Sequence, residues 1–368
     1  MEDVFRFADE LGPVKILYIS LREPSLKAVV VVDNTACGQA IGGVRMAPDV
    51  SAEEARRLAR AMTLKNAAAG LPHGGGKSVI FADPKIPSRD KEQLIRAFAG
   101  AIADLTEYVP GPDMGTDELA MGWVHDEIGR AVGLPRELGG IPLDELGATG
   151  FGLAAAIEVA CQAINLELKG ARVAIQGFGA VGKHTARFLA PKGCVLVACS
   201  DSGGTLFSAD GLDVGALVSL KEAGKSVIDS PRGEKGNTDG IIDVPCDIWI
   251  PAARPDVLTG ENVGRLKARI VAQGANIPCT MEAEAILEKR GVLVLPDFVV
   301  NAGGVICAAA EYHGGSESTA FATIEEKIRK NTTLVIEQSR RAGVSMREAA
   351  IALATGRVRN AERARRWR

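Results

Sequence analysis

The order of apolar and polar positions along the chain predicts an α/β protein. In the first part of the chain, short β-branched runs bounded by turn residues alternate with longer stretches whose apolar residues recur at helical spacing. The pattern predicts helices over residues 4–11, 51–69, 91–106 and 118–132, strands over 15–21, 27–33 and 78–81, and a short strand before residue 41. These elements are irregular in length, so the pattern favours an α/β domain and leaves its topology open.

The second part of the chain has the pattern of a dinucleotide-binding fold. A long apolar helix is predicted over residues 149–166, and an apolar strand from Arg172 then runs directly into G-x-G-x-x-G at 177–182, which opens another helix. A second strand over 194–200 ends at Asp201. A strand before the glycines, a helix after them and an acid that closes the second strand together make this fingerprint specific for a dinucleotide.

Three further predicted strands end in loops of small or amide-bearing residues. They cover residues 247–251, 269–273 and 293–295, and the chain is predicted to be helical from residue 318 onward. Ligands of such sheets bind beyond the carboxyl ends of the strands. We therefore expect Asn276 and Asn301 to meet the nicotinamide or the substrate, although each taken alone could be a simple turn residue.

The glycine fingerprint also indicates how the cofactor is held. A helix N-terminus with bare glycine backbone suits a pyrophosphate, and Asp201 can bind ribose hydroxyls. Asp201 favours NAD because it repels a 2′-phosphate, whereas Ser202 and the two glycines after it leave room for NADP. The predicted cofactor-binding residues of this part are Gly177, Phe178, Gly179, Ala180, Val181, Gly182, Asp201, Ser202, Ala252, Ala253, Asn276 and Asn301.

Two lysines flank the sequence K-N-A-A-A-G-L-P-H-G-G-G-K at residues 65–77. Lys65 continues the apolar stripe of the predicted 51–69 helix, and a lysine on a buried face is costly unless it meets an anion. Lys77 follows three glycines, which let backbone and ligand approach closely. We expect both ammonium groups to converge on one pocket, one to hold a carboxylate and one for proton transfer. The alternative is that Lys65 extends to solvent and Lys77 lies in a surface loop.

A carboxylate follows in the turn-rich segment V-P-G-P-D-M-G-T-D, residues 109–117. Asp113 stands between proline and glycine just before the predicted 118–132 helix, where an aspartate is more commonly a turn residue than a pocket acid. Both interpretations stay open at this point. The glycine-rich stretch 139–147 is typical of an interdomain connection.

Composition and charge narrow the class of protein. A chain of 368 residues is long enough for two domains, and its net charge of −3 gives no reason to expect nucleic acid or an anionic membrane as a partner. No apolar run of membrane-spanning length and no signal peptide is recognised, and the basic run 363–368 is expected to be a solvated helix end. Seven scattered cysteines without C-x-x-C and four isolated histidines favour free thiols in a reducing cytoplasm, with no metal site.

Several motifs in a fixed order together resemble those of the glutamate/leucine/phenylalanine/valine dehydrogenase family. They are G-G-V-R-M at 42–46, M-T-L-K at 62–65, L-P-H-G-G-G-K at 71–77, G-P-D-M-G-T-D at 111–117, A-T-G at 148–150, Q-G-F-G-A-V-G at 176–182, Q-G-A-N at 273–276 and P-D-F-V-V-N-A-G-G-V-I at 296–306. The likeness covers residues 27–313, most of the chain. Any one of these motifs would be weak, but the whole order is specific.

The resemblance implies a two-domain α/β fold. An N-terminal α/β domain for substrate binding and oligomerisation, residues 1–140, would be joined by returning C-terminal helices at about 335–368. A Rossmann-like NAD-binding domain would span residues 141–334, and a cleft between the two would close on the ligand. The family also implies a homo-oligomer that acts on a small-molecule amino acid with NAD, or alternatively NADP, as the cofactor.

The resemblance also implies roles for single residues. Lys65 would bind the α-carboxylate, Lys77 would be the general base, and Asp113 would pass a proton to the amino nitrogen. Thr149, Asn276 and Asn301 would line the nicotinamide and the reacting carbon. The reaction is oxidative deamination: Cα gives up a hydride, the iminium adds water, and the carbinolamine collapses to a 2-oxo acid and ammonia.

Departures from the glutamate-specific members bear on the substrate. Those members resemble this chain but have a lysine before the first glycine pair, a glutamine three residues before Lys65, and a serine seven residues beyond the asparagine of N-A-G-G-V. Ile41, Met62 and Ala308 stand there instead, beside Gly42. A buried carboxylate without a partner costs about several kcal/mol. We therefore predict an apolar substrate of the leucine/valine/phenylalanine class.

Two other functions remain open. The first alternative is a glutamate dehydrogenase, if a lysine from elsewhere in the chain enters the pocket. The second, from a different class, is a non-catalytic NAD-binding sensor or assembly subunit. A binding module needs no acid/base pair, so the joint presence of Lys65, Lys77, Asp113 and Asn301 argues against the sensor.

Overall fold

The computed structural model describes residue 5 and residues 7–365, and the chain divides into two compact units. The first unit comprises Met1–Pro142, Val305–Ala320 and Ile351–Arg368, and the second comprises Leu143–Gly304 and Phe321–Ala350. The first boundary lies two residues from the predicted one. Two stretches differ from the prediction. Residues 305–320 join the first unit and not the predicted 141–334 block, and residues 335–350, predicted to return to the first domain, belong to the second unit.

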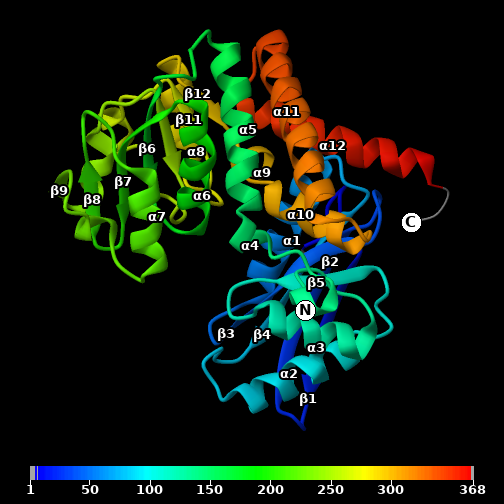
Figure 1. The fold of residues 1–368 in the computed structure, drawn as a ribbon. Coiled ribbons are helices and arrows are strands. Elements are labelled where there is room, and N and C mark those ends of the chain that lie inside the picture. The colour runs from blue at the N-terminus through cyan, green and yellow to red at the C-terminus, as the bar shows by residue number, and fades with distance from the viewer. Residues whose placement is uncertain (1–4, 6, 366–368) are drawn as a thin grey trace. The chain divides into compact units, whose positions relative to one another are not determined.

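The first unit is built on a mixed five-stranded sheet (Figure 1). Its strands are β1 (Lys15–Leu21), β2 (Leu26–Asn34), β3 (Ala40–Ala47), β4 (Gly74–Phe81) and β5 (Tyr108–Pro112), in the order β1-β2-β4-β3-β5. β3 is parallel to β4 and β5, whereas β2 is antiparallel to β1 and β4. Its helices are α1 (Ala52–Ala68), α2 (Ser88–Ala101), α3 (Glu118–Ile128), the 3₁₀ helix η1 (Arg136–Leu138), and parts of α10 (Gly303–Tyr312), α11 (Glu317–Ala342) and α12 (Met346–Ala364).

Burial on both faces explains the continuous β-branched run of β2. Val30 and Val32 belong to the core that includes Phe98 of α2, whereas Val29 and Val31 belong to the core under α1. Successive side chains of a strand point to opposite faces, so a strand covered on both sides has apolar residues at every position. Helices therefore cover both faces of this sheet (Figure 1).

The triple glycine is part of a strand and not of a loop. β4 begins at Gly74, whereas the sequence pattern predicts a glycine loop followed by a strand from residue 78. A Cβ on Gly75 would lie 2.0 Å from the backbone nitrogen of Thr63 in α1, and one on Gly76 would lie 2.8 Å from the Tyr108 ring. The glycines are needed because α1 and Tyr108 pack directly against the β4 backbone.

Two of the predicted helical segments lie at the ends of the chain. The predicted helix over 4–11 is wrong for residues 5 and 7–11, which form turns in which Asp9 accepts a hydrogen bond from the backbone of Leu11 at 2.9 Å. Gly12 and Pro13 follow immediately and prevent a helix from continuing. The helix end predicted within the basic run falls at Ala364, and residues 4, 6 and 366–368 lie outside the described part of the chain.

The second unit has the predicted Rossmann-like fold (Figure 1). Its strands are β6 (Arg172–Gln176), β7 (Val195–Asp201), β8 (Gly204–Phe207), β9 (Glu234–Gly236), β10 (Ile248–Pro251), β11 (Ile270–Ala272) and β12 (Leu293–Leu295). They lie in the order β12-β11-β10-β6-β7-β8-β9. The five from β12 to β7 are parallel, and β8 and β9 extend the sheet as antiparallel strands that the sequence pattern does not predict.

Helices complete this unit. They are α4 (Leu143–Leu146), α5 (Ala148–Ala163), α6 (Ala180–Leu189), α7 (Val214–Glu222), α8 (Met281–Lys289), α9 (Asp297–Val300), the start of α10, most of α11, the start of α12, and the 3₁₀ helices η2 (Ala190–Lys192), η3 (Val227–Asp229), η4 (Thr238–Asp243) and η5 (Val263–Arg265). α11 packs along α5, where the Phe151 and Phe321 rings are 4.9 Å apart and Arg329 pairs with Glu158 at 2.6 Å (Figure 1).

One helical stretch is apolar enough to resemble a membrane span. By length and composition alone, Leu143–Ala163 could cross a membrane, which the sequence pattern does not predict. However, 67% of its apolar window is buried within the protein. The helix α5 packs against α6 and β11, so its apolar residues serve as core.

Candidate functional site

Lys77, Asp113 and Arg45 form a cluster of charges in the first unit. Lys77 projects from β4, Asp113 directly follows β5, and Arg45 projects from β3, so three parallel strands place the three groups together. The Lys77 ammonium contacts Asp113 Oδ2, and Arg45 Nε donates to Asp113 Oδ1 at 2.7 Å. Arg45 also donates to Glu54 of α1 at 2.5 Å. Both oxygens of Asp113 are thus held by cations.

Burial and charge act in opposite directions on the two ionisable partners. Only 4% of Lys77 is exposed, and burial lowers the pKa of its ammonium by more than Asp113 raises it. Burial by itself would raise the pKa of Asp113, but Lys77 and Arg45 outweigh it, and the pKa of Asp113 falls below its ordinary value. The site therefore holds a carboxylate beside a lysine that gives up its proton more readily than usual, which suits acid–base chemistry.

Glycines and a buried tyrosine fix this cluster. A Cβ on Gly43 would lie 2.7 Å from Asp113 Cβ, so only glycine leaves room for the carboxylate at that place. Tyr108 is fully buried and donates to the carbonyl oxygen of Gly42 at 2.8 Å. Thr116 accepts a hydrogen bond from the Asp113 backbone at 3.0 Å. Asp113 is therefore a turn residue and an ion-pair partner at once.

Lys65 and Met62 lie on α1, which begins as the sequence predicts. Ser51 caps the helix by accepting a hydrogen bond from the Glu54 backbone at 3.1 Å, while the Glu54 side chain binds Arg45 and does not complete a capping box. Lys65 is half-buried in the last turn of α1, and Met62 is half-buried one turn before it. The same helix meets β4 through Thr63 and Gly75.

Ile41 and Ala308, far apart in sequence, lie in one apolar cluster of the first unit. Ile41 of β3, Val109 of β5, Val132 and Ala308 of α10 pack together, with Tyr312 against them. Met62 is not a member of this cluster. The structure thus brings together two of the three residues that replace the polar positions of the glutamate-specific relatives.

A carboxylate anchors α10 beside this cluster. Glu311 Oε1 accepts hydrogen bonds from the backbone nitrogens of Gly133 at 2.7 Å and Leu134 at 3.1 Å. Its other oxygen, Oε2, accepts one from Ile141 at 2.7 Å. Ala308 lies one helical turn before Glu311, so this anchor fixes the place of Ala308 as well.

In the second unit, the loops that follow β6, β10 and β11 meet at the carboxyl edge of the sheet. Gly177 has φ +94°, and a Cβ there would lie 2.6 Å from Ala253 Cβ. A Cβ on Gly274 would lie 3.2 Å from Ala252 and from Val181. β6 lies between β7 and β10, so the strand order reverses at this point, where open α/β sheets bind their ligands.

The start of α6 has the form of a pyrophosphate cradle. Gly179 and Ala180 are exposed, a Cβ on Gly179 would meet nothing within 4 Å, and no side chain caps the helix. The first backbone N–H groups of α6 thus have no side-chain cap, and these residues fit a bound dinucleotide. Phe178 differs from the rest of the predicted set because its side chain is fully buried and its backbone nitrogen donates to Ser200 at 2.7 Å.

Asn301, Asn276 and Thr149 lie around the same edge. Asn301 Nδ2 donates a hydrogen bond to Asn276 Oδ1 at 3.1 Å. Thr149 lies beside Gly304, since a Cβ added to that glycine would be 3.2 Å from Thr149 Oγ1. Asn301 is 4% exposed, and its Oδ1 accepts no hydrogen bond from any residue that the structure describes. A buried acceptor without a donor costs about 1–3 kcal/mol, so Asn301 Oδ1 suits the amide or ammonium group of a ligand.

The carboxylate of Asp201 is already surrounded by donors. Oδ1 accepts from Ser226 Oγ at 2.6 Å and from the Gly203 backbone at 2.9 Å. Oδ2 accepts from Lys221 Nζ at 2.6 Å and from the Val227 backbone at 3.0 Å. The predicted role of Asp201, direct binding of ribose hydroxyls, would require at least one of these donors to give way.

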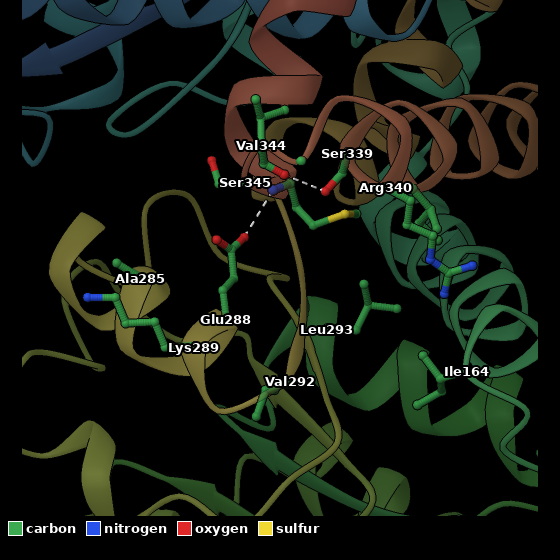
Figure 2. A pocket seen from close by; sticks show the side chains of 14 residues that line it. Ile164, Ala285, Glu288, Lys289, Val292, Leu293, Ser339, Arg340, Val344 and Ser345 are labelled. Carbon is green, nitrogen blue, oxygen red and sulfur yellow. Dashed lines mark hydrogen bonds between the residues drawn. The ribbon is translucent and has the colours of Figure 1, made fainter.

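A cavity of about 520 Å³ lies elsewhere in the second unit (Figure 2). Its walls come from the ends of α8 and α11, from residues 343–346 and from the residues that open β12. Glu288 accepts a hydrogen bond from the Met346 backbone at 3.0 Å there, and burial raises the pKa of Glu288. The cavity adjoins the amino end of β12, whereas the cofactor loops follow carboxyl ends, and no predicted site residue lines it.

Sequence reasoning missed several residues that shape these sites. Arg45 could have been found, because a charge inside an otherwise apolar strand needs a partner. Glu311 gives a similar signal on an apolar helix. Lys221 gives none, because its pairing with Asp201 depends on where α7 packs. No group of three or more metal-ligating side chains occurs among residues 5 and 7–365.

A Rossmann-like unit with an open glycine cradle, in a chain that also holds a buried lysine–aspartate pair, defines a dinucleotide-dependent oxidoreductase. Two family models match the chain: "Glu/Leu/Phe/Val dehydrogenase, dimerisation domain" over residues 22–130 and "Glutamate/Leucine/Phenylalanine/Valine dehydrogenase" over residues 139–366. The chain belongs to this family. It is an amino acid dehydrogenase that acts on the CH–NH₂ group with NAD or NADP.

Three curated relatives illustrate the similarity. Glutamate dehydrogenase of Aeropyrum pernix is 40% identical over 357 residues, which is 91% of this chain and 85% of that protein. NADP-specific glutamate dehydrogenase of Saccharolobus shibatae is 36% identical, over 90% of this chain and 83% of that one. NAD-specific glutamate dehydrogenase of Staphylococcus aureus is 35% identical, over 91% and 85% respectively.

Solved structures agree with the fold. A hetero-hexameric glutamate dehydrogenase from Thermus thermophilus, in a leucine-bound form, has a TM-score of 0.85 and 30% identity, over 97% of this chain and 91% of that one. L-tryptophan dehydrogenase from Nostoc punctiforme has a TM-score of 0.76 and 27% identity, over 96% and 98%. The fold is thus shared by enzymes named for different amino acids.

Proposed function

We propose that this chain oxidatively deaminates an L-amino acid to the 2-oxo acid and ammonia, with Lys77 and Asp113 as its acid–base pair. The observation that carries the proposal is the contact of a buried lysine with a carboxylate that Arg45 also holds. The second unit binds the dinucleotide at the start of α6, and this cofactor supplies the hydride acceptor.

The residues of the first unit divide the remaining chemistry. Lys65 holds the α-carboxylate of the amino acid. Lys77, once deprotonated, takes a proton from the water that adds to the oxidised carbon. Asp113 passes a proton to the departing nitrogen, and Arg45 keeps the carboxylate in place for that transfer. Asn301 Oδ1, a buried acceptor, suits the ammonium of the substrate or the carboxamide of the cofactor.

Glutamate is the first candidate substrate. The three curated relatives at 35–40% identity are all named glutamate dehydrogenases, and each aligns over about nine-tenths of this chain. A glutamate side chain needs a cation or several hydrogen-bond donors at the far end of its pocket, because an unpaired buried carboxylate is costly.

An apolar amino acid is the second candidate, and a specific observation favours it. Ile41 and Ala308 pack with Val109 and Val132 and offer no donor to a carboxylate. Such a surface suits the leucine/valine/phenylalanine class. One missing or added methylene in such a pocket changes kcat/KM by roughly 10- to 200-fold, so the preferred side chain should stand out in a substrate panel.

The experiment is a panel of L-amino acids with NAD and with NADP, followed by the absorbance of reduced nicotinamide. Lys77→Ala should lower kcat by about 10²–10⁴-fold, the usual worth of general acid–base help. Lys85→Ala, which removes an exposed lysine just beyond β4, is the matched control and should keep wild-type turnover. Near-normal kcat in Lys77→Ala would reject the assigned role, and no turnover of any amino acid by the wild type would reject the function.

The assembly and compartment follow from the same assignment. The dimerisation-domain match over residues 22–130 supports a homo-oligomer, whose mass can be measured by light scattering. All seven cysteines are free thiols, which suits a reducing cytoplasm. A monomer at assay concentration would contradict the proposed assembly.

A further inference from the structure

The ribose end of the cofactor site carries a balanced pair of charges. Asp201 closes β7, where an acid ordinarily selects NAD by binding ribose hydroxyls and repelling a 2′-phosphate. Here Lys221 of α7 pairs with it at 2.6 Å, and only 9% of the Asp201 side chain and 23% of the Lys221 side chain are exposed. At this distance and burial, the positive charge cancels most of the field that the carboxylate would present to a ligand.

Hydrogen bonds reinforce the same conclusion. An ionised carboxylate has about four lone-pair positions, and Ser226, Gly203, Lys221 and Val227 supply four donors to Asp201. Its acceptor capacity is therefore used within the protein. The structure therefore lacks the feature that usually favours NAD at such a site, which is a carboxylate free to accept hydrogen bonds from two ribose hydroxyls.

The groups around the pair suit an anion. Ser202 is exposed next to Asp201, and Lys221 retains some exposure. The Lys221 ammonium donates one hydrogen bond to Asp201 and has two further N–H groups. An ammonium and a hydroxyl are usual ligands of phosphate. We propose that Lys221 makes this chain accept NADP as well as NAD, by cancelling the charge of Asp201 and offering a cation to the 2′-phosphate.

Lys221 is thus a residue that sets cofactor choice and not a catalytic residue. The opposite signs of the pair give two opposed tests. Lys221→Met leaves the Asp201 charge uncancelled and should weaken NADPH binding by about tenfold or more, while NADH binding changes by less than about threefold. Asp201→Asn removes the negative charge and should shift the preference towards NADPH by a similar factor. Lys221→Arg keeps the positive charge and should remain close to the wild type.

Binding is measured by the fluorescence of NADH and NADPH titrated with protein, which needs no amino acid and no turnover. The kcat/KM ratio for NADP over NAD is the second readout. Lys225→Met, which removes an exposed lysine between Lys221 and Ser226, is the matched control and should change neither ratio. Because binding does not depend on the substrate, the result stands even if the proposed amino acid chemistry fails.

Each outcome either supports or overturns the proposed role of Lys221. A selective loss of NADPH affinity in Lys221→Met, with circular dichroism unchanged, supports the proposal, as does increased sensitivity of NADPH binding to salt relative to NADH. Equal loss of both nucleotides would make Lys221 a structural residue and overturn the proposal. A wild type that binds NADH at least about a hundredfold more tightly than NADPH would overturn it too. If Lys221→Met fails to fold, Lys221→Gln, which also removes the positive charge but keeps a polar side chain, gives the same decision.

Discussion

The ammonium of Lys77 meets the carboxylate of Asp113 in a site that leaves 4% of the lysine exposed. The two residues come from neighbouring parts of one sheet, β4 and the end of β5, and Arg45 holds the second carboxylate oxygen at 2.7 Å. The pair is therefore fixed by the backbone of the first unit before any ligand binds, a form of preorganisation that favours proton transfer.

The pH profile should report the protonation of Lys77. The base acts when deprotonated, so kcat/KM should rise with pH through the pKa of Lys77, which burial places below its ordinary value of 10.5. Asp113 raises the pKa of Lys77 within this balance, so Asp113→Asn should move that titration to lower pH.

Because Asp113→Asn is expected to lose activity, the titration of Lys77 is followed directly and not through turnover. The rate of reductive methylation of Lys77, read by mass spectrometry as a function of pH, gives the pKa in both proteins. A Lys77 titration that moves to higher pH in Asp113→Asn would contradict the assigned pairing.

Arg45 should matter for turnover although it was not predicted as a site residue. Arg45→Ala removes the hydrogen bond to Asp113 Oδ1 and one of the two cations that lower the pKa of Asp113. We expect kcat to fall by about 10- to 100-fold, with the acid limb of the pH profile moved to higher pH. Glu54→Gln, which changes the other partner of Arg45 but leaves the Arg45–Asp113 hydrogen bond in place, should cost much less. Equal losses in both variants would mean that Arg45 acts by general stability.

The close packing around Asp113 gives an independent test of whether the position of its carboxylate matters for catalysis. A Cβ in Gly43→Ala would lie 2.7 Å from Asp113 Cβ and 2.9 Å from the Pro112 carbonyl, so the carboxylate must move. A displacement of this size at the reacting groups should cost about 10²-fold in kcat. Gly100→Ala is the control, because that glycine of α2 has nothing within 4 Å and the change should stabilise the helix by about 0.5–1 kcal/mol. Full activity in Gly43→Ala would show that the position of Asp113 is not critical.

Exchange of the two apolar pocket residues should move specificity. Ile41→Lys together with Ala308→Ser places a cation and a hydroxyl where Ile41 and Ala308 now pack. If these residues contact the substrate side chain, the kcat/KM ratio of glutamate to leucine should rise by at least about tenfold. The measurement is the same panel of amino acids for both proteins. An unchanged ratio would place the side-chain pocket elsewhere.

Local pattern predicted much of the fold. β1, β7 and β12 lie within a residue of their expected bounds, since buried strands carry β-branched runs and the glycine fingerprint marks its own strand and helix. The pattern does not predict the structure where tertiary packing determines the bounds of an element or the unit to which a segment belongs. β4 extends through Gly74–Gly76 because α1 and Tyr108 pack closely there, and no pattern in 305–320 indicates that it belongs with the first unit.

Single residues show the same limit at the site. Lys77 and Asp113 were identified by motif, but the pairing of Asp201 with Lys221 depends on how α7 packs beside β7. A prediction from sequence can place an acid at the end of a strand. It cannot tell whether the rest of the fold has already occupied that acid.

Glu311 should govern the position of α10 in the first unit. Its two oxygens accept three backbone hydrogen bonds, from Gly133, Leu134 and Ile141. An amide in Glu311→Gln keeps one acceptor oxygen and turns a donor towards the other backbone N–H groups, which leaves at least one buried donor unpaired. The expected cost is about 1–3 kcal/mol of stability, measured as a lower urea midpoint.

The effect on catalysis should differ from a loss of stability alone. Ala308 lies one turn before Glu311, so a looser α10 should raise KM for the amino acid more than it lowers kcat, while the affinity for NADH is unchanged. Glu317→Gln is the matched control, because Glu317 is half-exposed and its 3.3 Å pair with Arg136 is a surface contact of little worth. If Glu311→Gln lowers kcat alone and leaves KM intact, α10 does not position the substrate pocket, and the role of Ala308 in specificity would have to be abandoned with it.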